Sequence, residues 1–118
     1  MSTSATKTPS RIVWFELPAG DPQRAQAFYG RLFGWSFQPF GEEEYHMTYE
    51  GGGAIMGVPD QSGLMAYFGV EDVDAALAQV REFGGEAGEK QEISGVGLYA
   101  RCTDTEGNAF GLYQDLSA

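Results

Sequence analysis

The chain carries the same succession of secondary-structure signals twice. The segments DPQRAQAFYGRLFGW and VEDVDAALAQVREFGG each predict a helix that follows one strand and precedes three more. Aligning the expected helix caps, Asp21 and Asp72, gives an offset of 51, and aligning the last hairpins, at Gly52 and Gly107, gives an offset of 55. Because neither half is large enough to bury its sheet alone, we expect the two halves to pair.

Local signals define the ends of both predicted helices. Asp21 and Asp72 are of a residue type that caps helix N-termini, and Pro22 suits the first helical position. Gly34 ends the first helix, and the glycines at 84–85 end the second. The first helix has an apolar stripe at i, i+3, i+4, i+7 and i+8, formed by Ala25, Phe28, Tyr29, Leu32 and Phe33. The stripe of the second is formed by Val73, Ala76, Leu77 and Val80.

The predicted strands are short and are separated by turns, several of them rich in glycine. They span residues 12–17, 35–40, 44–50 and 54–58 in the first half, and 64–70, 86–93, 97–104 and 109–114 in the second. Residues 1–10 are predicted to be a flexible polar lead and residues 59–63 a linker. Residues 11–115 then form a single domain of two modules, about 11–58 and 63–115.

The composition excludes several classes of partner and site. Hydrophobic residues make up 42% of the 118, which excludes disorder for most of the chain, and no apolar run approaches the ~18 residues of a membrane span. The net charge of −10 would repel nucleic acid and anionic membranes. Cys102 is the sole cysteine, which excludes an internal disulfide, and we expect it to pack as a small hydrophobe. The N-terminal segment has no signal-peptide pattern, which predicts a cytoplasmic protein.

The two helix segments, together with DTEGNAFGLYQ near the end of the chain, resemble the vicinal oxygen chelate superfamily of glyoxalase I, extradiol dioxygenases and bleomycin-resistance proteins. The resemblance covers roughly residues 11–115 and suggests a small glyoxalase-like protein. It implies an α+β fold of two tandem βαβββ modules, whose curled mixed sheets surround a cavity and carry the helices on the outer face. Since this fold hosts isomerases, dioxygenases, epimerases and drug binders, it does not define a reaction.

Strand alternation predicts which side chains face that cavity. In the first strand Val13, Phe15 and Leu17 form an apolar face suited to the helix, so Trp14 and Glu16 should point to the cavity. The two offsets extend this prediction to the other strands, and under the offset of 55 the position of His46 corresponds to that of Arg101. The predicted ligand-binding residues are Trp14, Glu16, His46, Met56, Met65, Tyr67, Tyr99, Arg101 and Tyr113. Aromatic walls are typical of small-molecule pockets, although these side chains could instead simply fill the cavity.

The resemblance also implies a divalent metal held by the first, fourth, fifth and eighth strands. In this chain the corresponding residues are Trp14, Met56, Met65 and Gly111, none of which is a plausible ligand for a hard or borderline divalent ion. We therefore predict that the usual metal site is absent and that no cofactor is bound. An improvised metal site at Glu16 and His46 is not favoured, because two donors are too few.

Glu16 and His46 are the two candidates for catalysis, since a carboxylate and an imidazole can both transfer protons. Each has a structural alternative. Glu16 could form an ion pair with Arg101 or Arg11, and His46 could be a partly exposed strand histidine.

We predict a glyoxalase-like small-molecule-binding protein that lacks the usual catalytic metal and binds an aromatic or cationic compound. The alternative is a lyase, isomerase or dioxygenase related to glyoxalase I, and a third hypothesis is a module that associates with another protein. A homodimer is expected, because two-module chains of this superfamily commonly dimerise and because the weak strands at 35–40 and 86–93 leave sheet edges that gain from coverage. We expect neither a nucleic-acid nor a membrane partner.

Overall fold

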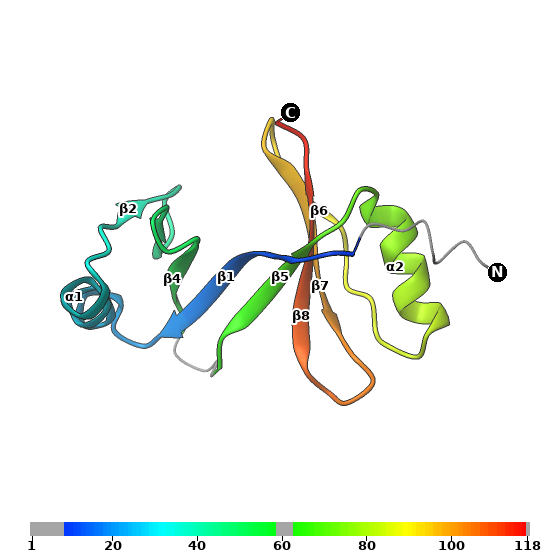
Figure 1. Cartoon of the computed structure of the whole chain (residues 1–118), viewed down its shortest axis with the longest axis horizontal. Coiled ribbons are helices and arrows are strands. Elements are labelled where there is room, and N and C mark those ends of the chain that lie inside the picture. The colour runs from blue at the N-terminus through cyan, green and yellow to red at the C-terminus, as the bar shows by residue number, and fades with distance from the viewer. Residues whose placement is uncertain (1–8, 59–62, 118) are drawn as a thin grey trace. The chain divides into compact units, whose positions relative to one another are not determined.

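The computed structural model describes residues 9–58 and 63–117, and it divides the chain into two compact units (Figure 1). The α1 unit comprises Val13–Tyr67, and the α2 unit comprises Met1–Ile12 and Phe68–Ala118. Most of the predicted lead and linker lies outside the described residues.

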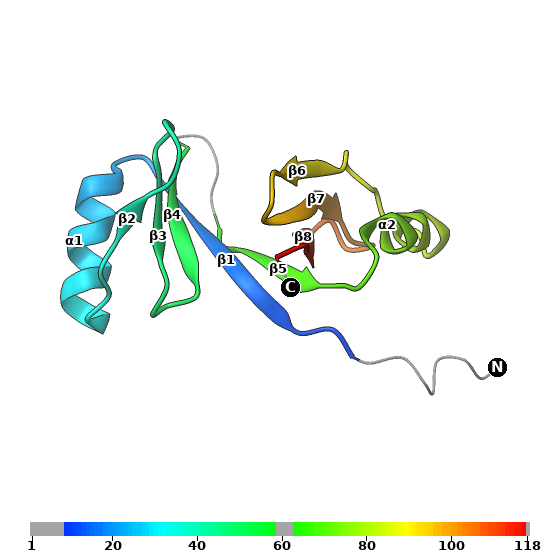
Figure 2. The ribbon, with the colours of Figure 1, turned by 90° about the horizontal axis from the view of Figure 1, so that it is seen from above.

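The α1 unit is built from β1 (Ile12–Ala19), α1 (Pro22–Phe33), β2 (Gln38–Pro39), β3 (Tyr45–Thr48) and β4 (Gly53–Gly57). Its strands follow the order β2-β3-β4-β1, in which β1 runs parallel to β4 and the other pairs are antiparallel. Helix α1 lies against β4, and Figure 2 shows it alongside β2, β3 and β4. The strand predicted at 35–40 is reduced to two residues, so β2 is a very short edge.

The predicted ends of α1 are confirmed. The side chain of Asp21 accepts a hydrogen bond from the backbone N–H of Arg24 at 3.1 Å, and Pro22 occupies the first helical position. Gly34 has a φ of 75° and donates its N–H to the carbonyl of Gly30 at 2.9 Å. Only glycine adopts this left-handed conformation without strain, which is why the helix ends here.

The apolar stripe of α1 is only partly covered. The ring of Tyr29 stacks on Trp35 with centroids 6.1 Å apart. The neighbouring residues Phe28 and Leu32 are each 59% exposed. No residue of α1 is buried, so the helix presents an apolar surface to solvent.

Trp35 organises an aromatic cluster in the α1 unit. Its ring lies 5.9 Å from that of Phe15, 5.0 Å from that of Phe33 and 6.4 Å from that of Phe37, measured between centroids. The turn between β3 and β4 passes so close to Trp35 that a Cβ at Gly51 would lie 2.6 Å from its ring. Glycine is therefore required at this position for steric reasons.

The α2 unit repeats the pattern with β5 (Met65–Gly69), α2 (Val73–Glu82), β6 (Gln91–Ile93), β7 (Gly97–Thr103) and β8 (Ala109–Asp115). The first three residues of β5 belong to the α1 unit. The strand order is β5-β8-β7-β6, and the β6–β7 and β7–β8 pairs are antiparallel. The strand predicted at 86–93 is reduced to β6 and one isolated bridge between Glu86 and Thr103.

The α2 unit has a buried core between α2 and its sheet. It is formed by Val73, Leu77, Ala100, Cys102 and Leu112. Cys102 is 4% exposed, which confirms that it packs as a small hydrophobe. Apolar residues of α2 therefore cover β7 and β8, unlike much of the stripe of α1.

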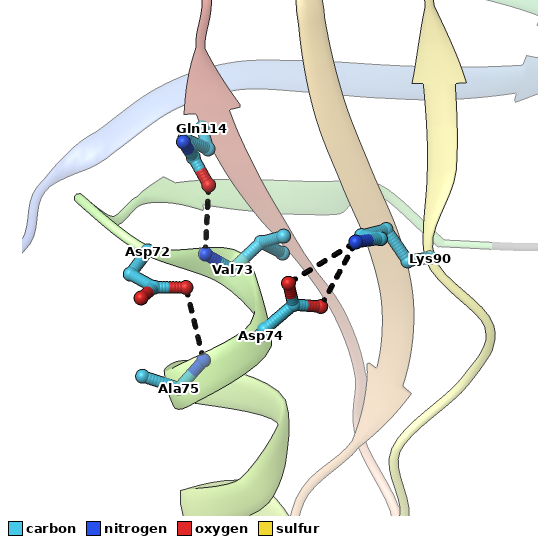
Figure 3. Close-up of polar contacts among 6 residues, drawn as sticks. All are labelled: Asp72, Val73, Asp74, Ala75, Lys90 and Gln114. Carbon is cyan, nitrogen blue, oxygen red and sulfur yellow. Dashed lines mark hydrogen bonds and ion pairs between the residues drawn. The ribbon is translucent and has the colours of Figure 1, made fainter.

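Three side chains from outside α2 help to hold its first turn (Figure 3). Asp72 accepts from the backbone N–H of Ala75 at 3.1 Å, as its position predicts. Gln114 of β8 accepts from the N–H of Val73 at 2.9 Å, and Lys90 pairs with Asp74 at 3.1 Å. The bonds to Asp72 and Gln114 satisfy helix N–H groups that have no partner within the helix, and the Lys90–Asp74 pair joins two side chains.

The elements follow one another in the order βαβββ twice along the chain, which confirms the predicted α+β fold and the repeated element order. Neither helix of the described residues is long and apolar enough to cross a membrane.

Candidate functional site

The strand register of the α1 unit defines which side chains share a face of its sheet. Cross-strand partners point to the same side, and neighbours along a strand alternate. Pro18 pairs with Met56, and Met56 pairs with Tyr45. Because Glu16 lies two residues before Pro18, the side chains of Glu16, Met56 and Tyr45 share one face.

His46 lies on the opposite face from Glu16, so its predicted orientation is wrong. Its partner on β4 is Ile55, which is 1% exposed and belongs to the α1 side of the sheet. The Nε2 atom of His46 lies 2.9 Å from Oε1 of Glu44, and the His46 side chain is 15% exposed. His46 is therefore the partly exposed strand histidine of the alternative interpretation, and it does not join Glu16 in one site.

A difference between the two hairpins explains the error. The paired residues Thr48 and Gly53 of the β3–β4 hairpin enclose four residues, whereas Thr103 and Ala109 of the β7–β8 hairpin enclose five. A single sequence offset therefore cannot align both strands of the first hairpin with both strands of the second. A shift of one residue moves every side chain of a strand to its other face.

Tyr45 takes the place that the sequence offset gave to His46. It pairs with Met56, just as Arg101 pairs with Gly111 in the other module. Sequence reasoning missed Tyr45 because the length of the glycine-rich turn before β4 was ambiguous. The alternation of side chains in EYHMTYE would identify Tyr45 if the turn before β4 were assumed to contain an even number of residues.

Glu16 is the centre of four hydrogen-bonded side chains, Trp14, Glu16, Tyr45 and Tyr67, which we call the Glu16 cluster. The Tyr45 hydroxyl donates to Oε2 of Glu16 at 2.8 Å, and the Tyr67 hydroxyl donates to Oε1 at 2.9 Å. The indole N–H of Trp14 donates to the hydroxyl oxygen of Tyr45 at 2.8 Å. Glu16 and Tyr67 are each 4% exposed, whereas Trp14 and Tyr45 are half-buried.

The cluster holds a charged carboxylate beside neutral phenols. Two O–H donors on two carboxylate oxygens are the arrangement that suits an ionised acid. Burial, and then the charge of Glu16, raises the pKa of Tyr45 well above its ordinary value of 10.0. Tyr45 therefore stays protonated and keeps donating to Glu16.

Two methionines of the predicted set lie near this cluster in the fold. Met65 is 6% exposed and lies two residues before Tyr67 on β5, so the two side chains point to the same side. Met56 is half-buried on the face of Glu16. Their place beside a cavity and their contact with a ligand stay predictions.

The remaining predicted residues belong to the α2 unit. Tyr99 pairs with Tyr113 on the sheet face that is opposite to the α2 core, and Arg101 shares that face. The guanidinium carbon of Arg101 lies 5.4 Å from the centre of the Tyr99 ring, a cation–π contact. The Tyr113 hydroxyl donates to the Val96 carbonyl at 3.2 Å, and burial followed by the charge of Asp115 raises the pKa of Tyr113.

The residues that the resemblance assigns to metal positions do not fit a divalent metal. The indole nitrogen of Trp14 is occupied as a donor to Tyr45, Met56 and Met65 offer only thioethers, and Gly111 has no side chain. Within residues 9–58 and 63–117, no group of three or more His, Cys, Asp or Glu side chains could hold a metal ion. The improvised site of Glu16 and His46, which the sequence did not favour, cannot form, because these residues lie on opposite faces.

One part of the chain matches a family model. Residues 11–49 match the bleomycin resistance protein-like N-terminal domain. Curated protein sequences give no significant match.

Solved structures share the fold over most of the chain. A glyoxalase/bleomycin resistance/dioxygenase superfamily member from Vibrio splendidus is 21% identical with a TM-score of 0.65, covering 91% of this chain and 99% of that chain. The methylmalonyl-CoA epimerase of Streptomyces coelicolor, in complex with 2-nitronate-propionyl-CoA, is 17% identical with a TM-score of 0.67, covering 94% and 98%. A 2,3-dioxygenase from a Pseudomonas species is 14% identical with a TM-score of 0.67, covering 88% and 42%. The TM-scores establish a shared fold, whereas identities this low show no shared activity.

Proposed function

The chain has the fold of the vicinal oxygen chelate superfamily, and on that premise we propose that it binds a small aromatic or cationic molecule at the Glu16 cluster without a conventional catalytic metal. The observation that carries this proposal is the buried carboxylate of Glu16, held by the hydroxyls of Tyr45 and Tyr67.

Energetics supports a recognition role for Glu16. Burying a carboxylate costs several kcal/mol, and hydrogen bonds to it offset part of that cost. An apolar residue at this position would avoid that cost. In this proposal the carboxylate of Glu16 serves ligand recognition, and the hydroxyls of Tyr45 and Tyr67 hold its oxygens in fixed positions.

The surroundings of Glu16 suit an aromatic or cationic ligand. Trp14 and Tyr45 are half-buried and offer ring surface for stacking or for cation–π contact. The net charge of −10 would raise the local concentration of a cation and speed its capture.

The residues argue for a binder over a metal-dependent enzyme. The resemblance assigns Trp14, Met56, Met65 and Gly111 to the metal-ligand positions of the superfamily, and none of them is a plausible ligand for a divalent metal. Proton transfer by Glu16 with His46 also loses support, because His46 lies on the other face of the sheet. Activity as a lyase, isomerase or dioxygenase is therefore the alternative that the tests below distinguish from binding.

The first test is ligand binding measured by calorimetry with a set of cationic and aromatic compounds. We expect Glu16→Gln to weaken binding by about 10- to 100-fold, because it removes the buried charge. Glu44→Gln is the matched control, since Glu44 bonds to His46 on the opposite face, and it should leave the affinity unchanged. Equal losses in the two variants, or no binding by any compound, would contradict the proposal.

The second test is elemental analysis of tag-free protein purified without chelator. We expect less than about 0.1 divalent metal per chain, because the donors of a tight site are lacking. Near-stoichiometric nickel, zinc, iron or manganese would contradict the proposal and favour an enzyme of the glyoxalase or dioxygenase type.

A further inference from the structure

Trp14 is the member of the Glu16 cluster whose polar group can only donate. An indole carries one N–H and no acceptor, whereas a phenol hydroxyl both donates and accepts. The Trp14 N–H donates to the hydroxyl oxygen of Tyr45 at 2.8 Å, and the Tyr45 hydroxyl donates to Oε2 of Glu16 at 2.8 Å. The direction of this chain of hydrogen bonds is therefore set at Trp14.

The phenol of Tyr45 joins two strands that are not neighbours. The strand order is β3-β4-β1, so Tyr45 of β3 reaches Trp14 and Glu16 of β1 across β4. The β4 residue paired with Glu16 is Ala54, whose small side chain leaves the phenol room to cross. The two hydrogen bonds at the far end of the phenol fix its hydroxyl beside β1.

The Trp14 N–H determines where the Tyr45 hydroxyl hydrogen points. A hydroxyl hydrogen rotates about the C–O bond and takes the direction that its surroundings favour. The Trp14 N–H occupies one lone pair of the Tyr45 oxygen and so directs the hydrogen toward Glu16. A hydroxyl that accepts a hydrogen bond also donates more strongly, because successive bonds polarise one another. Both effects strengthen the bond that holds Oε2 of Glu16.

We infer that Trp14 is a positioning residue of the binding site and acts through Tyr45: its N–H keeps the Tyr45 hydroxyl donating to Glu16, so that Oε2 of Glu16 stays in place for the ligand. This role rests on the proposed function, which assigns ligand recognition to Glu16. It depends on the bond between Tyr45 and Oε2 and is independent of the other groups that interact with Glu16.

The first experiment measures by NMR how fast the tyrosine hydroxyl protons exchange with water in Trp14→Phe. This variant keeps a ring at position 14 but has no N–H, so we expect the Tyr45 proton to exchange at least about tenfold faster than in the wild type. The Tyr67 proton is the internal control. Tyr67 donates to the other oxygen of Glu16, and its exchange should change by less than about twofold.

Three results would overturn the role of Trp14. They are unchanged exchange of the Tyr45 proton in Trp14→Phe, equal acceleration of both tyrosine protons, and a Tyr45 proton that already exchanges too fast to observe in the wild type. Tyr45→Phe gives a measurement that needs no change at position 14. It should accelerate exchange of the Trp14 indole proton, and unchanged exchange would contradict the bond between the two side chains.

The second experiment is a double-mutant cycle on the affinity for benzylammonium, an aromatic cation, measured by calorimetry. Trp14→Phe and Tyr45→Phe should each weaken binding by about 3- to 10-fold. The double variant should bind no more weakly than Tyr45→Phe alone, because Trp14 acts through Tyr45. Trp35→Phe is the matched control: it changes the tryptophan of the aromatic cluster and should leave the affinity unchanged.

The outcomes of the cycle separate the role of Trp14 from the proposed function. Losses that multiply in the double variant would show that Trp14 acts on the ligand independently of Tyr45, and would overturn the positioning role alone. No binding of benzylammonium by the wild type would contradict the proposed function, and the exchange experiment would then decide by itself whether Trp14 directs the Tyr45 hydroxyl.

Discussion

Tyr45 is the residue that links the Glu16 cluster to the pH dependence of stability. Burial and the charge of Glu16 raise the pKa of Tyr45 well above 10.0 in the folded chain. In the unfolded chain the same phenol ionises near pH ~10. Above that pH the folded state binds more protons than the unfolded state, so the stabilising contribution of Tyr45 is present below pH ~10 and is lost as the pH rises.

We predict that Tyr45→Phe flattens this alkaline loss of stability. Below pH ~9 the variant should be less stable than the wild type by about 1–3 kcal/mol, because Trp14 and Glu16 each lose a partner. Between pH ~9 and ~11 its free energy of unfolding, measured in urea, should fall less steeply than that of the wild type. Tyr49→Phe, at a residue that is 63% exposed, is the control and should follow the wild type. Identical slopes for Tyr45→Phe and the wild type would contradict the role of Tyr45.

At the scale of elements, locally determined features were predictable and pairing-dependent ones were not. The caps Asp21 and Asp72 and the terminator Gly34 act on residues within one helical turn, and the structure confirms all three. Tyr45 and Gln114 escaped prediction, because their roles depend on strand register and on the approach of β8 to α2. The local sequence shows neither whether the turn before β4 has an even or an odd number of residues nor that β8 lies beside the start of α2.

The turn before β4 gives a prediction at the same scale. Gly51→Ala would place a Cβ 2.6 Å from the Trp35 ring, so either the turn or the aromatic cluster must shift. We expect a loss of about 1–3 kcal/mol in the free energy of unfolding, with a lower thermal midpoint. Gly20→Ala is the control, because a Cβ there meets nothing within 4 Å. Equal midpoints for the two variants would contradict the close approach.

For the whole molecule, the uncovered surface of α1 is the feature that bears on assembly. Phe28 and Leu32 are exposed, and a hollow of about 410 Å³ lies beside Phe28 at the start of the helix. Arg24 and Arg31 are the only charged residues from Pro22 to Phe33, in a chain with a net charge of −10. The acidic surface of a second copy would therefore attract this basic and apolar surface. The acidic surfaces of two copies would instead repel each other.

We propose that two copies associate through α1, and we predict that Phe28→Ser combined with Leu32→Ser converts the dimer into a monomer. Burying two such side chains contributes about 3 kcal/mol or more, so their loss should weaken association on the order of 100-fold. The molar mass from light scattering during gel filtration reports the change. Phe83→Ser, which alters a 67% exposed residue next to α2, should stay dimeric. A monomeric wild type would contradict the dimer, and a dimeric double variant would show that its interface lies elsewhere than α1.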